Sequence, residues 1–169
     1  SDNIIICSLT SGAQGSGYYR DQINGPNNWT LSGLVDRPSY RVNCSSGGTI
    51  VPDIGNAGLP TLNSTYNVTL DNAAPQAFAV CVSGLSDTVY NGGPLPLALP
   101  GAPGCNLMVS ADVLDLRITS PQGTASRTFS IPSSPAYVGV DLFHQWAVLD
   151  AVNTLGIVVS DAGKATIDQ

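Results

Sequence analysis

The feature that most constrains this chain is a series of short segments in which apolar and polar residues alternate. Residues 65–71 (TYNVTLD) place Tyr66, Val68 and Leu70 on one side and polar residues on the other. A period of two is that of a half-buried β-strand. Such segments recur at intervals of about 8–12 residues between Gly, Pro and Asn turns, a spacing typical of a sandwich or barrel. We therefore predict an all-β fold: an antiparallel β-sandwich or jelly-roll-like domain with few or no helices.

Three further segments predict individual elements. Residues 77–85 (AFAVCVSGL) are apolar on both faces and predict a central strand. The pair Asn91 and Gly92 predicts a two-residue hairpin turn. Residues 156–167 (GIVVSDAGKATI) predict a closing hairpin around residues 161–163, because Asp and Gly favour turns.

Residues 111–119 (ADVLDLRIT) predict a strand whose two faces differ in character. One face carries opposite charges and the other is aliphatic. In the order of the chain, Val113, Asp115 and Arg117 alternate with Leu114, Leu116 and Ile118.

The composition agrees with an all-β chain. All twelve acidic residues are aspartate, there is one lysine, and the chain holds 18 Gly and 12 Pro. Asp and Asn favour turns and caps, whereas Glu and Lys favour helices. The net charge of −6 disfavours nucleic acid and anionic membrane surfaces as partners. No stretch approaches the roughly 20 apolar residues that span a bilayer, so we predict no membrane insertion.

The beginning of the chain is less regular than the rest. We predict a strand-containing extension over residues 1–39 and the sandwich domain over residues 40–169, with one continuous domain as the alternative. Ile4, Ile5 and Ile6 predict a strand in the extension. The apolar run is too short for a signal peptide and no basic region precedes it. We therefore expect a mature N-terminus left by cleavage, and a soluble exported chain.

The four cysteines are Cys7, Cys44, Cys81 and Cys105. Their number is even, their spacing is wide and no pair forms C-x-x-C, so two disulfides are predicted, with three connectivities open. The single histidine cannot complete a usual Cys/His zinc site. Disulfides indicate an oxidising compartment, and so a secreted, extracellular or cell-surface protein. The alternative is four buried free thiols in a cytosolic protein.

No set of residues predicts an enzyme. His144 is the only histidine and no G-x-S-x-G motif occurs, so we expect a packed or edge histidine rather than a general base. The carboxylate pairs Asp112/Asp115 and Asp150/Asp161 could be written as glycosidase pairs, but aspartates near turns are usually turn formers. The prediction is that the chain has no catalytic residues.

We predict no cofactor, with calcium as the alternative. Asp112 with Asp115, or Asp150 with Asn153, could supply the hard oxygen ligands that calcium prefers. No EF-hand spacing or other calcium signature accompanies them.

Aromatic residues near loops indicate sugars as a second class of possible ligand. Trp29, Tyr18 and Tyr19 could form a platform on which sugars stack. Packing in the core, with tyrosine hydroxyls at its rim, is the favoured interpretation.

Three segments together resemble a known kind of domain. GGPLPLALPGAPGCNLMVSADV, IPSSPAYVGVDLFHQWAVLD and NTLGIVVSDAG resemble an uncharacterised C-terminal β-sandwich domain of large exported bacterial proteins, over about residues 40–167. The resemblance carries no catalytic residue. It implies that Cys44 bonds Cys105, which leaves Cys7 to bond Cys81. His144 stands where the family usually has an apolar residue.

These observations predict a non-enzymatic extracellular structural or assembly protein, a homo-oligomer such as a filament or surface-layer subunit. The strand of Ile4, Ile5 and Ile6 would complete a sheet edge by strand addition, in its own chain or in a neighbour. Addition to a neighbour in a head-to-tail contact gives an open filament. The alternative is a carbohydrate-binding, lectin-like extracellular module with glycans as partners, which predicts an exposed row of aromatic side chains or a calcium-assisted acidic site.

Overall fold

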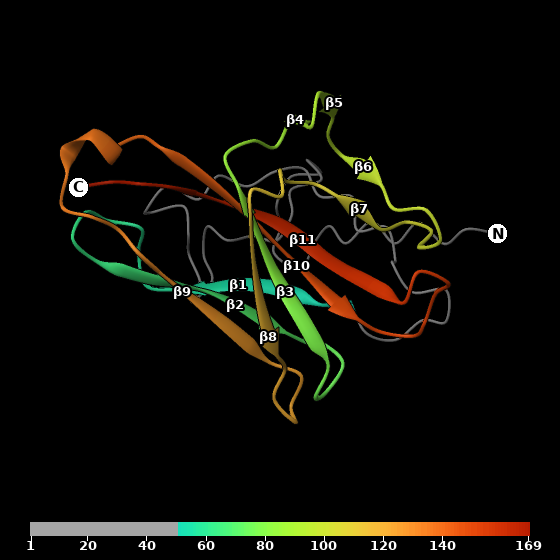
Figure 1. Cartoon of the computed structure of the whole chain (residues 1–169). Helices are drawn as coiled ribbons and strands as arrows, with labels where there is room; N and C mark the ends of the chain where they lie inside the picture. Colours follow the sequence, from blue (N-terminus) through green and yellow to red (C-terminus); the bar gives the residue numbers. More distant parts are fainter. Residues whose placement is uncertain (1–50) are drawn as a thin grey trace, which may run out of the picture.

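The computed structural model describes residues 51–169. The predicted extension over residues 1–39 and its boundary with the sandwich domain lie outside the described residues. Within them, two antiparallel sheets pack face to face, which confirms the predicted all-β sandwich (Figure 1). The described residues contain no α-helix, and their one helical element is a 3-10 turn at Pro135–Tyr137.

The two sheets contain three and four strands. The three-stranded sheet has the order β1-β2-β9 and is formed by β1 (Asp53–Ala57), β2 (Thr65–Asp71) and β9 (Ala125–Ser130). The four-stranded sheet has the order β11-β10-β3-β8 and is formed by β3 (Phe78–Gly84), β8 (Val113–Ile118), β10 (Asp141–Leu149) and β11 (Ile157–Thr166). β3 lies between β10 and β8, so its prediction as a central strand is confirmed.

Two short hairpins connect β3 to β8. They are formed by β4 (Val89–Tyr90) with β5 (Gly93–Pro94), and by β6 (Leu97–Ala98) with β7 (Asn106–Leu107). Asn91 and Gly92 form the predicted turn, with φ values of 49° and 76°. Both lie in the left-handed region that a primed hairpin turn requires. The hairpins gather above one end of the four-stranded sheet (Figure 1).

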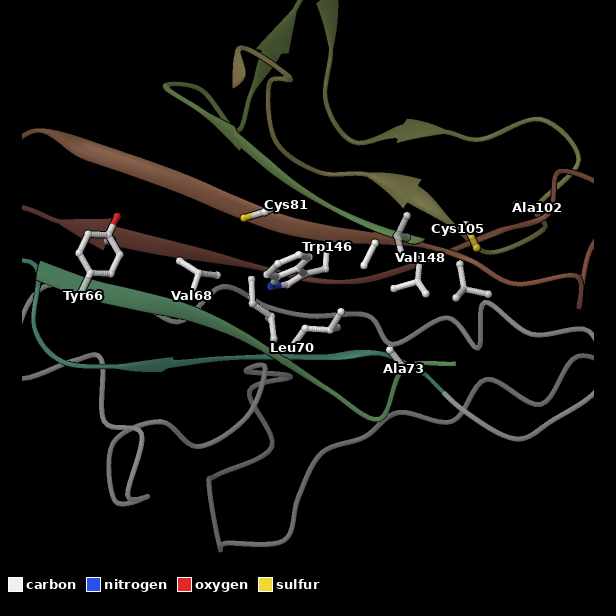
Figure 2. Close-up of a cluster of buried hydrophobic side chains, with 14 of the residues drawn as sticks. Tyr66, Val68, Leu70, Ala73, Cys81, Ala102, Cys105, Trp146 and Val148 are labelled. Atoms are coloured by element: carbon white, nitrogen blue, oxygen red, sulfur yellow. The ribbon is translucent and has the colours of Figure 1, made fainter. Parts of the chain in front are cut away.

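The main core lies between the two sheets. Val68 and Leu70 of β2 pack with Trp146 and Val148 of β10, and all four side chains are fully buried (Figure 2). The indole Nε1 of Trp146 donates to the carbonyl oxygen of Thr69 at 3.1 Å. The largest core side chain therefore satisfies its one polar group on the opposite sheet.

The predicted hairpin around residues 161–163 is wrong. β11 runs through these residues as one strand paired with β10, and the register shifts between Gln145 and Ala147. At the shift, the N–H of Trp146 donates to the Ser160 hydroxyl at 2.9 Å, and this hydroxyl donates to the carbonyl oxygen of Asp161 at 2.6 Å. A β-bulge thus accommodates the turn-forming residues without reversing the chain.

A matched pair of leucine substitutions tests the position of the core. Leu70→Ala should lower the free energy of unfolding by about 2–5 kcal/mol, because it removes buried methyl groups and leaves a cavity. Leu85→Ala should change it by less than about 0.5 kcal/mol, since Leu85 is 66% exposed. Urea unfolding monitored by tryptophan fluorescence measures both, and equal losses would contradict the assignment of the core.

Candidate functional site at the edge of the four-stranded sheet

His144 is a packed residue, as predicted. It lies on β10 with its side chain fully buried. Its Nε2 is 2.9 Å from the Tyr66 hydroxyl and its Nδ1 is 2.9 Å from the Ser83 hydroxyl. Burial lowers the pKa of His144 to about 3, so the ring is neutral at pH 7. Both ring nitrogens are occupied by side chains of the core, away from solvent.

The burial of His144 predicts a loss of stability in acid. Its pKa is about 3 in the folded chain, against an ordinary value of 6.5 for an exposed histidine. Between these pH values only the unfolded chain takes up the proton. The contribution of His144 to the free energy of unfolding is therefore fully present above pH 6.5 and decreases as the pH falls. At pH 4.5 the unfolding free energy should be about 2–3 kcal/mol lower than at pH 7.5.

Urea unfolding of the wild type and of His144→Gln at both pH values measures this contribution. The variant loses stability at pH 7.5 but should lose less on acidification, because the titrating group is gone. An equal pH dependence in the two proteins would show that His144 is not the group responsible.

Cys81 corrects a sequence prediction. It is a free thiol, fully buried on the inner face of β3, so the structure does not form the predicted Cys7–Cys81 bond. Cys7 lies outside the described residues. The Cys81 side chain lies in the core close to Trp146 (Figure 2), where packed side chains of both sheets surround it. Burial also raises the pKa of its thiol to about 11.

Cys105 is disulfide-bonded, and Cys81 is not its partner because that thiol is free. The predicted Cys44–Cys105 pairing therefore stays a prediction.

Thiol labelling tests the state of Cys81. In the folded protein at pH 8, Cys81 should resist maleimide, because it is buried and protonated. In urea without reductant it should react completely. Peptide mass mapping reads out both results, and a peptide in which Cys81 is linked to Cys7 would contradict the free thiol.

Asp112 and Asp115, considered above as a carboxylate pair, each have partners within the fold. The Oδ2 atom of Asp112 accepts from the N–H of Leu85 at 2.9 Å and from the Ser110 hydroxyl at 2.8 Å. Asp115 forms ion pairs with Arg117 and with a residue of β9, described below. In the part of the chain that the structure describes, no group of three His, Cys, Asp or Glu side chains could hold a metal ion. The absence of a cofactor stays a prediction, with calcium as its alternative.

The turn between β10 and β11 contains Asp150 and Asn153, the other candidate residues for the calcium alternative. The N–H of Asp150 donates to the carbonyl oxygen of Gly156 at 3.0 Å. The side-chain oxygen of Asn153 accepts from the N–H groups of Gly156 at 2.9 Å and Ile157 at 3.3 Å. Asn153 therefore stabilises a turn, in the way that Asx side chains commonly do.

The charged side of β8 faces the three-stranded sheet. One carboxylate oxygen of Asp115 is 2.8 Å from Nη1 of Arg117, and the other is 2.8 Å from Nε of Arg127 on β9. The Arg127 guanidinium also lies over the ring of Phe129, 5.0 Å from its centroid. These contacts connect β8 to β9 across the space between the sheets.

The aliphatic side of β8 consequently faces solvent. Leu114, Leu116 and Ile118 are 63%, 58% and 64% exposed. Phe78 lies opposite Ile118 on β3 and is 50% exposed. We call these four residues the apolar face. The hairpins β4–β5 and β6–β7 lie near the end of β3 and the start of β8, away from Phe78 and Ile118 (Figure 1).

The backbone of β8 has an open side. The N–H of Thr119, the residue after β8, donates to the carbonyl oxygen of Ala77 at 2.9 Å, in the same register as the β3–β8 ladder. In an antiparallel pair, alternate residues direct both backbone groups to the partner strand. The backbone N–H and C=O groups of Asp115 and Arg117 therefore point toward β3, like those of Thr119. The backbone groups that face away from β3 are those of Leu114, Leu116 and Ile118, and we call this side the β8 edge.

No strand among residues 51–169 pairs with the β8 edge. The neighbouring edge of the three-stranded sheet, on β9, is obstructed by arginines. The Nε of Arg117 donates to the carbonyl oxygen of Ser126 at 3.4 Å, and Arg127 donates to that of Thr128. Arg117 also reaches one carbonyl of the β8 edge, that of Leu116, at 3.2 Å. The remaining N–H and C=O groups of the β8 edge have the geometry that accepts an added strand.

The apolar face is absent from the site residues predicted from the sequence, although the alternation in residues 111–119 predicts both sides of the strand. A signal was available. Asp115 and Arg117 need charged partners wherever they are partly enclosed, and Arg127 follows within the next strand. The site residues that were predicted from the sequence, Ile4, Ile5, Ile6, Trp29, Tyr18 and Tyr19, lie outside the described residues.

No protein-family model matches this chain, and no curated protein or solved structure matches it. The resemblance to the exported bacterial domain therefore stays a prediction. Among the described residues, no helix has the length and apolar character needed to cross a membrane.

Proposed function

We propose that this chain is a non-enzymatic extracellular structural protein that self-assembles by β-strand addition, with the β8 edge as the acceptor. The observation that carries the proposal is the open backbone of β8 beside the exposed side chains of Leu114, Leu116 and Ile118. Main-chain hydrogen bonds supply affinity in this mode of association, and alternate side chains supply specificity.

An edge of this kind is unusual in a protein that stays monomeric. Natural sheets protect their edges with charges, prolines, bulges or covering segments. β9 follows this rule, since Arg117 and Arg127 donate to its edge carbonyls. β8 instead presents an aliphatic face next to its open backbone, and covering it removes apolar surface from water at about 25 cal/mol per Å².

The donor strand predicted from the sequence is the N-terminal strand of Ile4, Ile5 and Ile6. It lies outside the described residues, so the contacts of residues 51–169 support the accepting edge alone. The extracellular location rests on the sequence, since four widely spaced cysteines predict disulfides, which persist in oxidising compartments.

The carbohydrate-binding alternative receives no comparable support from residues 51–169. It calls for a row of exposed aromatic side chains. The exposed aromatics of the described residues are Phe78, on a sheet face, and Tyr137, in the 3-10 turn between β9 and β10. We therefore advance self-assembly alone.

A proline substitution on the β8 edge tests the proposal. The N–H of Leu116 faces away from β3, so Leu116→Pro blocks an added strand without removing a β3–β8 hydrogen bond. The full chain should form oligomers or filaments in sedimentation velocity and negative-stain electron microscopy. Leu116→Pro should raise the protein concentration that is needed for assembly at least tenfold, so that monomers predominate where the wild type assembles.

Leu85→Lys is the matched control, because it also replaces an exposed leucine but lies outside β8. It should assemble like the wild type. Near-ultraviolet circular dichroism of the buried Trp146 verifies that each variant is folded. A wild-type chain that stays monomeric at high concentration would refute self-assembly.

A further inference from the structure

β8 has a sequence that is complementary to itself. Around Leu116, opposite charges lie at equal distances on the two sides, Asp115 before it and Arg117 after it. Leu114 and Ile118 continue this symmetry. Resting on the proposed edge assembly, we infer that the strand that occupies the β8 edge is β8 of a second copy of this chain, antiparallel and centred on Leu116.

The backbone geometry fits this register. Leu114, Leu116 and Ile118 are the residues whose N–H and C=O groups face the open side. With Leu116 opposite Leu116 of the second copy, Leu114 lies opposite Ile118 of the second copy. Each of these residues therefore meets another with open backbone groups, and each pair exchanges two N–H···O bonds.

The charges select this register from its neighbours. With Leu116 opposite its counterpart, Asp115 lies opposite Arg117 of the second copy. A shift by two residues in either direction places Asp115 opposite Asp115, or Arg117 opposite Arg117, and like charges directly opposite are destabilising. A shift by one residue pairs an open backbone position with one already bonded to β3. The centred register alone combines backbone pairing with opposite charges.

Arg117 has a different partner in each state. In the single chain it pairs with Asp115 of its own strand and donates to the carbonyl oxygen of Leu116. In the dimer it turns to Asp115 of the second copy, which frees that carbonyl for the pairing across the edge. Asp115 keeps its second ion pair, with Arg127 of its own chain. No charge loses its partner when the edge closes.

The apolar faces of the two copies join in this arrangement. A two-fold axis perpendicular to the sheet places both apolar faces on one side. Leu114 then contacts Ile118 of the second copy, since opposite side chains have Cβ atoms about 4.5–5.5 Å apart. The contact uses the same patch on both copies, so it closes as a dimer with one continuous sheet.

Position-specific cross-linking tests the register. In Leu116→Cys the two substituted positions lie opposite each other, with Cα atoms about 5.5 Å apart, within the range for a disulfide. In Leu114→Cys or Ile118→Cys the two copies of the substituted position lie four residues apart, about 13 Å. The full chain, mildly oxidised, should give a covalent dimer through position 116 and at most a tenth as much through 114 or 118. Mass mapping identifies the linked peptide.

A charge substitution provides a second, independent measurement. Arg117→Asp places two carboxylates opposite each other and should weaken self-association at least tenfold, measured by sedimentation equilibrium. Arg117→Lys keeps the positive charge and should stay within about threefold of the wild type. Neither variant removes the Asp115–Arg127 ion pair, so the contact between the sheets is preserved.

The outcomes separate this inference from the proposed function. Cross-linking at 116 together with weaker association of Arg117→Asp supports a β8–β8 dimer. Assembly that is blocked by Leu116→Pro but gives no cross-link at 116 overturns the inference and leaves edge assembly standing, with another donor strand. A chain that does not self-associate at all overturns both.

Discussion

The ion pair between Asp115 of β8 and Arg127 of β9 determines which way β8 faces. It joins the two sheets where the chain passes from β8 to β9, with Nε of Arg127 2.8 Å from a carboxylate oxygen of Asp115. Because successive side chains point to opposite faces of a strand, placing Asp115 between the sheets directs its neighbours outward. The exposure of Leu114, Leu116 and Ile118 follows from that single orientation. The proposed function and the proposed dimer both depend on it.

The opposite face of the four-stranded sheet combines apolar packing with enclosed polar groups. Trp146 fills the space between the sheets and donates its indole hydrogen to Thr69. His144 and Ser83 are buried in the same sheet and satisfy each other, with Tyr66 completing the set. A buried polar group without a partner costs roughly 1–3 kcal/mol, so this cluster is tolerated because its hydrogen bonds are made. The same burial keeps His144 neutral.

Most of the fold could be predicted from local patterns. Alternation predicted β2 and β8, apolar residues on both faces predicted the central β3, and Asn91-Gly92 predicted the β4–β5 turn. The prediction failed at residues 161–163, where β10 offers a long partner strand and a bulge absorbs the turn residues. It failed at Cys81 as well, because a pairing inferred from a resemblance says nothing about which thiol the core encloses.

The sequence by itself determined that this chain forms strands, that Asn91 and Gly92 form a turn, and that residues 113–118 carry one charged and one aliphatic side. Those properties are local, since they depend on side-chain period and turn chemistry within a few residues. Only the tertiary structure decided which side of β8 faces water. That choice depends on Arg127, which reaches Asp115 from the other sheet. It also depends on the hairpins, which cover one end of the four-stranded sheet on the face that points away from the three-stranded sheet, and leave the β8 edge open. No pattern within one strand contains the position of its neighbours.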